Sequence, residues 1–310
     1  AKVLTELSAI HPLPDLILRY REFSKIKNTY IDALPRMRAV DGRVHTQFNE
    51  TVTTTGRLSS SDPNLQNIPV RTDFGRQIRS CFVPLREGEL FLSADYSQIE
   101  LRLLAHLSGD EHLVAAFNSG ADFHASTASR VFGLPVEAVT SELRSRAKAV
   151  NFGIVYGQQA FGLSQTLDIP VAEAREMIDR YFEAYPGVRT YLDETVAEAK
   201  ERGFAETMLG RKRHIPELKS SNGQQRAFGE RTAMNHPMQG SAADIIKMAM
   251  NEVQRRLLAE GFAAQLMIQV HDELDFSVPA GEVERLAAMV KEVMEGVVSL
   301  KVPLIADVSW

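Results

Sequence analysis

The clearest change in the hydrophobic pattern of this chain occurs at Asp95. Residues 90–92 form a short apolar run that predicts a buried strand. From residue 97 onward, apolar side chains recur at helical spacing. Asp95 therefore lies where a strand meets a helix. It can cap the helix, or rigid backbone can hold its carboxylate toward a cleft, and the stretch taken alone favours the cap.

A second strand pattern predicts a tight hairpin over residues 264–278. Apolar residues dominate 266–270, and apolar and polar residues alternate over 274–278. Residues 271–273 lie between the two strands, at the predicted turn. This position would expose Asp272 at the tip of a strand. A second exposed carboxylate makes a functional interpretation of Asp95 stronger than it is alone.

The rest of the pattern predicts a largely helical chain, and hence an α+β fold. We expect helices over 1–34 with a break at His11–Pro14, 96–135 with breaks near 109 and 120, 141–157, 171–202 with a break at 185–187, and 224–260. We expect short strands near 44–48, 51–55, 204–209 and 302–308, and a basic turn at 210–214. The predicted buried faces are Leu4, Leu7, Ile17, Tyr20 and Ile26 in the first helix, and Ala242, Ile245, Ile246, Ala249, Val253 and Leu257 in the last.

The helix predicted at 141–157 carries an unusual stripe of side chains. Arg144, Lys148, Phe152 and Tyr156 recur every four residues and therefore share one slowly drifting face. Two cations suit a triphosphate, and two aromatic rings suit a base. An ordinary amphipathic helix explains the same pattern equally well.

Several polar positions stand out, although each has an ordinary structural explanation. Arg231, Asn235 and Gln239 share a polar face of the last helix, and His124 follows a predicted N-cap at Asp122. A lone histidine is more often structural than functional. The loop over 53–72 carries amides and arginines that suit sugar, phosphate and minor-groove acceptors, although a solvated loop explains them slightly better: Arg57, Asn64, Gln66, Asn67 and Arg71.

Composition restricts the class of protein. The chain has 310 residues, 44% of them hydrophobic, which is enough for more than one lobe. A single cysteine, Cys81, excludes an internal disulfide and favours a reducing compartment. We find no signal-peptide pattern and no membrane-spanning apolar run. The net charge of -5 predicts no overall attraction to a polyanion, but basic residues dominate 36–86 and 202–231 while acidic residues dominate 272–297.

These charges suggest phosphoryl transfer if Asp95 and Asp272 end neighbouring strands. Adjacent strands lie about 4.8 Å apart, and paired divalent metals about 3.5–4 Å apart. The two carboxylates could then hold two Mg²⁺ ions, which take oxygen ligands and few carboxylates. Arg144 and Lys148 could neutralise the phosphates of the leaving group.

Three longer motifs in this chain resemble the signature motifs of family A DNA polymerases. They are DYSQIELR at 95–102, RSRAKAVNFGIVYG at 144–157 and QVHDEL at 269–274. The resemblance extends through the loop at 53–72 and through NHPMQGSAAD at 235–244. It covers nearly the whole chain, and three long motifs in order are very specific.

The resemblance implies a role for each matching residue. Asp95 and Asp272 would be catalytic metal ligands together with the Tyr96 carbonyl, and Glu273 would be an auxiliary acid. Lys148 would act with Arg144 on the triphosphate and supply a proton to pyrophosphate. The implied nucleotide pocket also contains Phe152, Tyr156, Gln98, His124 and Glu100, with Glu100 as the steric gate against a ribose 2′-hydroxyl. The implied primer–template contacts are Arg57, Asn64, Asn67, Arg231, Asn235, Gln239 and His271.

The resemblance also implies a right-hand polymerase architecture with an antiparallel palm sheet and helical fingers. The palm would use 41–108 and 226–310, the fingers 109–225, and residues 1–40 would be the end of a truncated helical thumb. The implied partners are primer–template DNA and deoxynucleoside triphosphates, and the implied cofactor is a pair of Mg²⁺ ions that Mn²⁺ could replace. A monomer in the bacterial cytoplasm, associated with the nucleoid and not with a membrane, would fit.

One departure and two alternatives remain at this stage. Asp275 and Ser277 stand where the family commonly has an apolar residue and a glutamate; we expect Asp275 to face outward and to be harmless. A primer–template-binding fragment with little catalysis is the main alternative, because so little of the thumb is present. A metal-dependent nuclease is weaker, because the chain shows no Asp-x-Glu motif with a distal aspartate.

Overall fold

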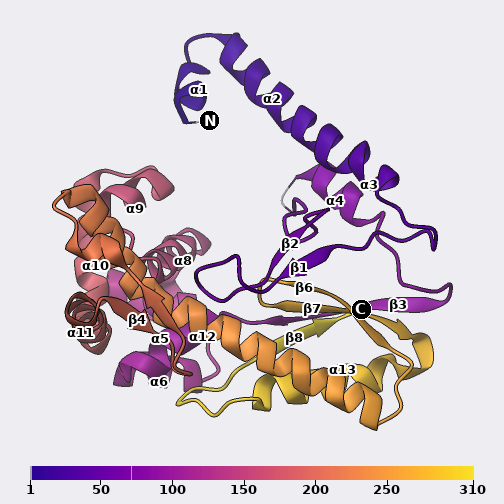
Figure 1. Ribbon diagram of the computed structural model, residues 1–310. Coiled ribbons are helices and arrows are strands. Elements are labelled where there is room, and N and C mark those ends of the chain that lie inside the picture. The colour runs from indigo at the N-terminus through magenta and orange to yellow at the C-terminus, as the bar shows by residue number, and fades with distance from the viewer. Residues whose placement is uncertain (1, 71) are drawn as a thin grey trace.

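A four-stranded antiparallel sheet forms the base of the protein (Figure 1). The computed structural model describes residues 2–70 and 72–310. The strand order is β6–β7–β3–β8, with β3 at Glu89–Tyr96, β6 at Gln265–Val270, β7 at Glu273–Pro279 and β8 at Ala306–Ser309. Both the predicted hairpin and the predicted strand before Asp95 are confirmed. Because β3 pairs with β7 and β8, segments far apart in the sequence form one surface.

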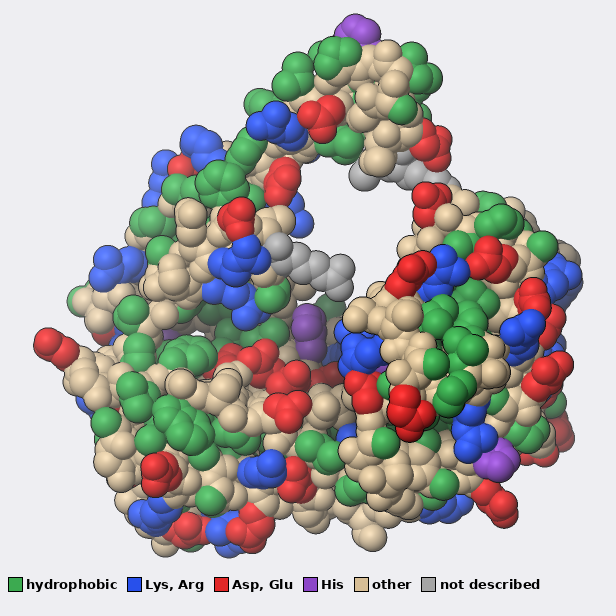
Figure 2. Space-filling model, turned by 180° about the vertical axis from the view of Figure 1, so that it is seen from behind, with side chains coloured by type: hydrophobic (Ala, Val, Ile, Leu, Met, Phe, Trp, Pro, Cys, Tyr) green, Lys and Arg blue, Asp and Glu red, His purple; other side chains and the backbone are tan. Residues whose placement is uncertain are grey.

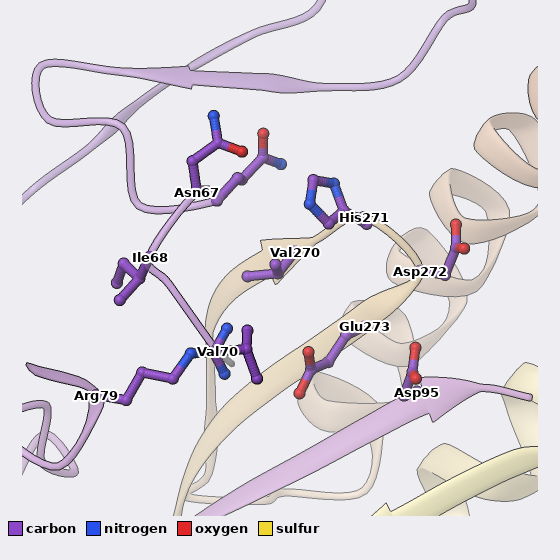
Figure 3. A pocket seen from close by; sticks show the side chains of 10 residues that line it. Asn67, Ile68, Val70, Arg79, Asp95, Val270, His271, Asp272 and Glu273 are labelled. Atoms are coloured by element: carbon purple, nitrogen blue, oxygen red, sulfur yellow. The ribbon is translucent and has the colours of Figure 1, made fainter. Parts of the chain in front are cut away.

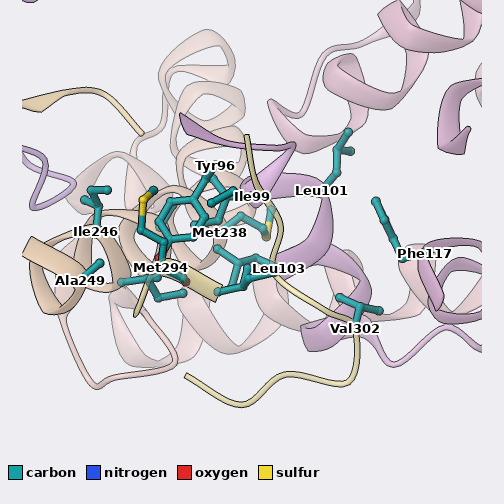
Figure 4. Close-up of a cluster of buried hydrophobic side chains, with 14 of the residues drawn as sticks. Tyr96, Ile99, Leu101, Leu103, Phe117, Met238, Ile246, Ala249, Met294 and Val302 are labelled. Atoms are coloured by element: carbon teal, nitrogen blue, oxygen red, sulfur yellow. Dashed lines mark hydrogen bonds between the residues drawn. The ribbon is translucent and has the colours of Figure 1, made fainter. Parts of the chain in front are cut away.

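Two helices and the start of a third pack against this sheet to form an apolar core. They are α12 at Gly223–Ala259, α13 at Val283–Gly296 and α5 at Ile99–Ser108. Figure 4 shows Tyr96 and Ile99 packed with Met238 of α12 and Met294 of α13. The Tyr96 hydroxyl also donates a hydrogen bond of 2.6 Å to the Met294 carbonyl, so the end of β3 is anchored from below. The strand end that carries Asp95 is therefore held firmly.

A helical lobe forms the second half of the molecule. Its helices are α5, α6 at Glu111–Asn118, α7 at Phe123–Phe132, α8 at Ser141–Val155, α9 at Ala160–Leu167, α10 at Val171–Ala184 and α11 at Pro186–Arg202. The predicted breaks are confirmed, since Gly109 ends α5 in the left-handed region at φ 61° and Asp110 caps α6. Asp122 caps α7 as predicted, by accepting the Ala125 N–H at 3.0 Å.

The longest helix, α12, connects the helical lobe to the sheet. It continues through Pro237, so that proline does not end it. Its predicted buried residues are confirmed, with Ala242 and Ile245 fully buried. The hairpin of β4 (Phe204–Glu206) and β5 (Lys212–His214) lies against α12, so part of the predicted basic turn is a strand. A carboxylate of α12, Asp244, holds this hairpin through Arg211 at 2.6 Å.

The N-terminal residues form a helical arm above the sheet (Figure 1). It contains α1 at Lys2–Leu7, α2 at Pro12–Ile26, a π-helical turn at Lys27–Ile31 and α3 at Ala33–Arg36; α4 follows at Asp73–Arg79, after a small sheet of β1 (Gln47–Asn49) and β2 (Ser59–Ser61). The break between α1 and α2 precedes the predicted prolines, because proline is tolerated in the first turn of a helix. The predicted buried face is wrong at Tyr20, which is 72% exposed, and at Leu7, whereas Ile26 is buried.

Two further predictions about local structure are wrong. Residues 51–55 form turns and bends, not a strand, because no segment among the described residues pairs with them. Asp275 does not face outward: it is 6% exposed on β7. The segment before β3 covers that face of the strand, as the 2.7 Å hydrogen bond from the Leu85 N–H to Ser277 Oγ shows.

Candidate active site

The end of β3 and the β6–β7 turn bring the predicted carboxylates together. Asp95 is paired in register with Glu273 across β3 and β7, and the Tyr96 N–H donates to the Asp272 carbonyl at 3.1 Å. Figure 3 shows the side chains of Asp95, Asp272 and Glu273 along one side of the same pocket. The sequence prediction that these strands are neighbours is therefore confirmed. The helix-cap interpretation of Asp95 is wrong, because Gln98 occupies the N-cap position of α5.

The pocket beside these carboxylates is a cleft of about 480 Å³. Its lining combines the acidic strand ends with the polar loop before α4: Gln66, Asn67, Ile68, Val70, Arg79, Asp95, Val270, His271, Asp272 and Glu273. In the space-filling view, the N-terminal arm and the two lobes surround an open hollow, with acidic side chains on its floor (Figure 2). A large ligand can therefore reach the carboxylates from the hollow.

The charge of Asp95 is poorly compensated, whereas Asp272 has Arg57 nearby. Two effects raise the pKa of Asp95 to about 6. The larger is the loss of surrounding water, and the smaller is repulsion from the nearby carboxylates of Glu273, Asp272 and Asp307. Burial also raises the pKa of Asp272, although Arg57 and His271 oppose the change. Asp272 Oδ1 is buried without a hydrogen-bond partner among the described residues. A bound cation would relieve this repulsion and satisfy that oxygen.

The residues present fit divalent ions that take most of their ligands from water and substrate. Among the described residues, no group of three or more His, Cys, Asp or Glu side chains is arranged to hold a metal by itself. The available set is the pair Asp95 and Asp272, with the Tyr96 carbonyl as a backbone candidate. Mg²⁺ commonly uses one or two carboxylates together with substrate phosphates.

One arginine connects the carboxylates to the helical lobe. Arg57 Nη2 lies 2.7 Å from Glu100 Oε1 and 3.6 Å from Asp272 Oδ1. Glu100 is 5% exposed, and burial raises its pKa while Arg57 lowers it. Burial, followed by the charge of Glu100, raises the pKa of Tyr156. The predicted gate and the predicted template-side tyrosine therefore act on each other electrostatically.

The predicted stripe lies on α8 and extends one residue past its end. Arg144 and Lys148 are exposed, Phe152 is half-buried and Tyr156 is 47% exposed. Arg144 Nε forms an ion pair of 2.7 Å with Asp122 Oδ2, at the start of α7. The apolar-core explanation therefore fails for Tyr156 and holds only in part for Phe152.

His124 lies inside the protein, whereas Gln98 is half-buried. His124 is 4% exposed, and its ring centroid is 5.9 Å from that of Phe152. Burial, with Arg144 and Lys148 nearby, lowers the pKa of His124 to about 4. Gln98 adopts the left-handed region at φ 56°, and its Oε1 is buried without a partner in the described part of the chain. A left-handed backbone at a non-glycine residue is typical of functional sites.

Two of the predicted DNA-contact residues line the cleft, and others lie on α12 or in the loop before α4. Asn67 and His271 line the cleft, and Arg231 packs against Gly157 at the end of α8. Asn235 donates to the Val155 carbonyl at 3.4 Å, and Gln239 follows one turn later on α12. Asn64 accepts the Gln66 N–H at 3.0 Å, which shapes the loop. Arg71 lies outside the described residues.

Sequence reasoning missed three partners of these residues. Gln66 donates to Gln269 Oε1 at 3.1 Å and so fixes the loop to β6. Ser93 donates to Glu273 Oε1, beside the buried Asp275. Asn151 lies 3.0 Å from the ring of His124. The sequence signal for the contact between Asn151 and His124 was the amide of Asn151 within the α8 motif, because polar residues on a buried helix face need a partner.

The whole chain matches one family model. The model for DNA polymerase family A matches residues 1–310. "DNA polymerase I" of Lactococcus lactis is 51% identical over 306 residues, which are 98% of this chain and 35% of that protein. "DNA polymerase I, thermostable" of Thermus aquaticus is 50% identical over 309 residues, which are 99% of this chain and 37% of that protein. The chain thus spans about a third of the length of these relatives.

A solved structure is similar over the full chain. It is the POL domain of Pol1 from M. smegmatis in a complex with DNA primer-template and dNTP. Its TM-score is 0.93 at 47% sequence identity, and the match covers 100% of this chain and 55% of that one. The predicted α+β architecture, with an antiparallel sheet and a helical lobe, is confirmed by this likeness.

Proposed function

Because this chain belongs to DNA polymerase family A, we propose that it adds deoxynucleotides to a primer 3′ end under the direction of a template strand. The relatives are bacterial proteins named DNA polymerase I, and the structural relative was solved with primer–template DNA and a nucleotide. The proposed substrates of this chain are the same two classes.

One observation carries this proposal: the end of β3 and the β6–β7 turn bring two carboxylates together beside a cleft, and α8 presents two exposed cations. Asp95 and Asp272 form the acidic side, and Arg144 and Lys148 the basic side. A triphosphate needs cations at its charged end and a metal-binding acid pair at the bond that breaks. A site that only bound DNA would gain nothing from neighbouring acids that repel phosphate.

Members of this family use divalent metal ions, and we assign Mg²⁺, as two ions, to this site, with Mn²⁺ able to substitute. Asp95, Asp272 and the Tyr96 carbonyl would hold them, with Glu273 as an auxiliary acid. Bound there, the ions would supply charge neutralisation and a more acidic primer hydroxyl.

The remaining steps fall to side chains of this chain. Arg144 and Lys148 would bind the triphosphate, and Lys148 would donate a proton to the departing pyrophosphate. Phe152 would lie against the sugar and base of the nucleotide, Tyr156 would stack at the template position, and Glu100 would exclude a ribose 2′-hydroxyl. Gln98 and His124 would complete the nucleotide pocket. The residues assigned to primer and template are Arg57, Asn64, Asn67, Arg231, Asn235, Gln239 and His271.

The architecture suggests which residues form each subdomain. We assign residues 41–108 and 226–310 to a palm, 109–225 to fingers and 1–40 to the end of a thumb. The protein would act as a monomer in the bacterial cytoplasm, near the nucleoid. Among the described residues, none of the helices combines the length and apolar character needed to cross a lipid bilayer.

Primer extension tests this proposal. The wild-type chain, a labelled primer–template and Mg²⁺ with nucleotides should give templated products, and Asp95→Asn should not. Asp193→Asn is the control, because Asp193 lies exposed on α11, pairs with Arg189 and has no assigned role. Duplex binding without extension by the wild-type chain would replace the proposal with the binding-fragment alternative.

A further inference from the structure

A buried chain of hydrogen bonds behind the nucleotide pocket determines which nitrogen of His124 carries the hydrogen. These hydrogen bonds connect His124 to Asn151 of α8, Asn151 to Thr127 of α7, and Thr127 to Tyr185. Asn151, Thr127 and Tyr185 are each 0% exposed. Water therefore cannot replace any of these contacts, and the donors and acceptors must match.

The orientation of the Asn151 amide follows from Thr127. The single hydroxyl hydrogen of Thr127 is donated to the Phe123 carbonyl at 3.0 Å, so its oxygen can only accept elsewhere. The Asn151 amide nitrogen lies 3.3 Å from that oxygen and donates to it. If the Asn151 amide were reversed, its two buried N–H hydrogens would have no acceptors. In the present orientation, only Asn151 Oδ1 has no partner in the described structure. Orphaned buried donors are rarer than under-satisfied carbonyl oxygens.

The second hydrogen of the same amide nitrogen fixes the histidine. It points to His124 Nδ1 at 3.0 Å, so Nδ1 accepts and the neutral ring must carry its hydrogen on Nε2. The charged groups that act on this ring are Asp122, Arg144 and Lys148. The ring therefore presents an N–H donor near the two cations assigned to the triphosphate.

We propose that Asn151 and Thr127 are positioning residues that hold His124 as the Nε2–H tautomer, so that its ring donates a hydrogen bond to a phosphate oxygen of the incoming nucleotide. This inference rests on the proposed function, because the acceptor is the bound nucleotide. The tautomer itself can be measured in the free protein, so the two ideas can fail separately.

The first test is the nitrogen chemical shifts of His124 in protein labelled with ¹⁵N-histidine at pH 7, assigned by their loss in His124→Gln. The expected result is a protonated Nε2 and an unprotonated Nδ1. Thr127→Val removes the acceptor that orients Asn151, and should populate the Nδ1–H form. Thr127→Ser keeps the hydroxyl and should restore the wild-type shifts. Tyr185→Phe removes a donor to Thr127 Oγ1 and should leave the tautomer unchanged.

The second test separates a positioning role from a merely structural one. Thr127→Val should raise the nucleotide KM by between about twofold and tenfold, in proportion to the lost Nε2–H fraction, with kcat nearly unchanged. In a His124→Gln background the same substitution should add nothing.

The result that overturns the inference is a wild-type Nδ1–H tautomer, or a Thr127→Val protein that keeps the wild-type shifts. The wild-type spectrum decides the tautomer even if a variant does not fold. A correct tautomer in a protein that extends no primer would instead contradict the proposed function.

Discussion

The acidic strand ends and the basic stripe on α8 differ in how the protein supports their charges. Asp95 lies at the end of β3 and Asp272 in the β6–β7 turn, next to further carboxylates and partly removed from water. Arg144 and Lys148 stand on the open face of a helix, and Arg144 forms an ion pair with Asp122. The first region is fixed and repulsive without a cation, whereas the second is accessible and suited to a mobile polyanion. Substitutions in the first should therefore affect catalysis, and those in the second nucleotide affinity.

The largest expected effect comes from neutralising the acidic region. Asp95→Asn or Asp272→Asn should lower nucleotide incorporation by on the order of 10³-fold or more, because each removes a metal-binding charge while its volume stays the same. Single-turnover extension measures the loss. Duplex affinity should change little, because neither carboxylate is itself assigned a contact with DNA. Incorporation at near wild-type rates would end the metal assignment.

Neutralising the stripe should produce a different kinetic signature. Lys148→Ala and Arg144→Ala should each raise the nucleotide KM by roughly 10- to 100-fold, through loss of a charge-assisted contact with phosphate. Lys148→Ala should also lower kcat, because Lys148 is the proposed proton donor to pyrophosphate. Steady-state kinetics at varied nucleotide concentration separates the two parameters. An effect of Arg144→Ala on kcat alone would contradict the difference between the regions.

A smaller change should strengthen the stripe. Asp122→Asn keeps the α7 cap, since asparagine caps as well as aspartate does, but removes the charge that pairs with Arg144. Because an exposed ion pair is worth at most about 1 kcal/mol, the nucleotide KM should fall by no more than about fivefold. Asp193→Asn, which removes a comparable exposed pair with Arg189 on α11, is the matched control. A rise in KM would show that Asp122 assists binding.

The smallest expected effect is on stability. The folded-state pKa of Asp95, about 6, lies above the usual value of 3.8, so the folded state binds more protons than the unfolded state between these pH values. The contribution of Asp95 to stability therefore falls as pH rises through this window. In metal-free buffer at pH 7.5, Asp95→Asn should gain about 1 kcal/mol after allowance for solvent screening. Thermal unfolding should show the gain shrinking toward pH 4, and a loss at pH 7.5 would contradict the repulsion.

The sequence predicted the strand ends well because their pattern is local. The change of period after Asp95 and the turn before Glu273 are both visible in a few residues, and the breaks near Gly109 were visible for the same reason. Failures occurred where long-range contacts decide. Tyr20 lies on an amphipathic helix, but no described segment covers that face. Asp275 alternates with apolar neighbours, yet a segment from before β3 covers it.

The candidate site shows the same difference between local patterns and long-range contacts. Asp95, Asp272 and the α8 residues came from motifs and spacing. Their partners did not, because contacts such as Asn151 with His124 depend on how two helices pack. The buried ion pair between Arg57 and Glu100 joins a loop to a helix, and no periodicity marks it. The roles assigned to these residues remain predictions until the variants above are measured.

The pairing of β3 with β7 has a consequence for how the protein is made. Ser93 and Glu273 are 180 residues apart in the chain. At typical rates of synthesis, β3 leaves the ribosome roughly 10 to 40 s before its partner strand does. The helices of the intervening lobe rely on nearby contacts and can form during that interval, while β3 waits with both edges unpaired. The acid pair is thus assembled late in synthesis, and a nascent chain released before β7 would carry a complete helical lobe without a working centre.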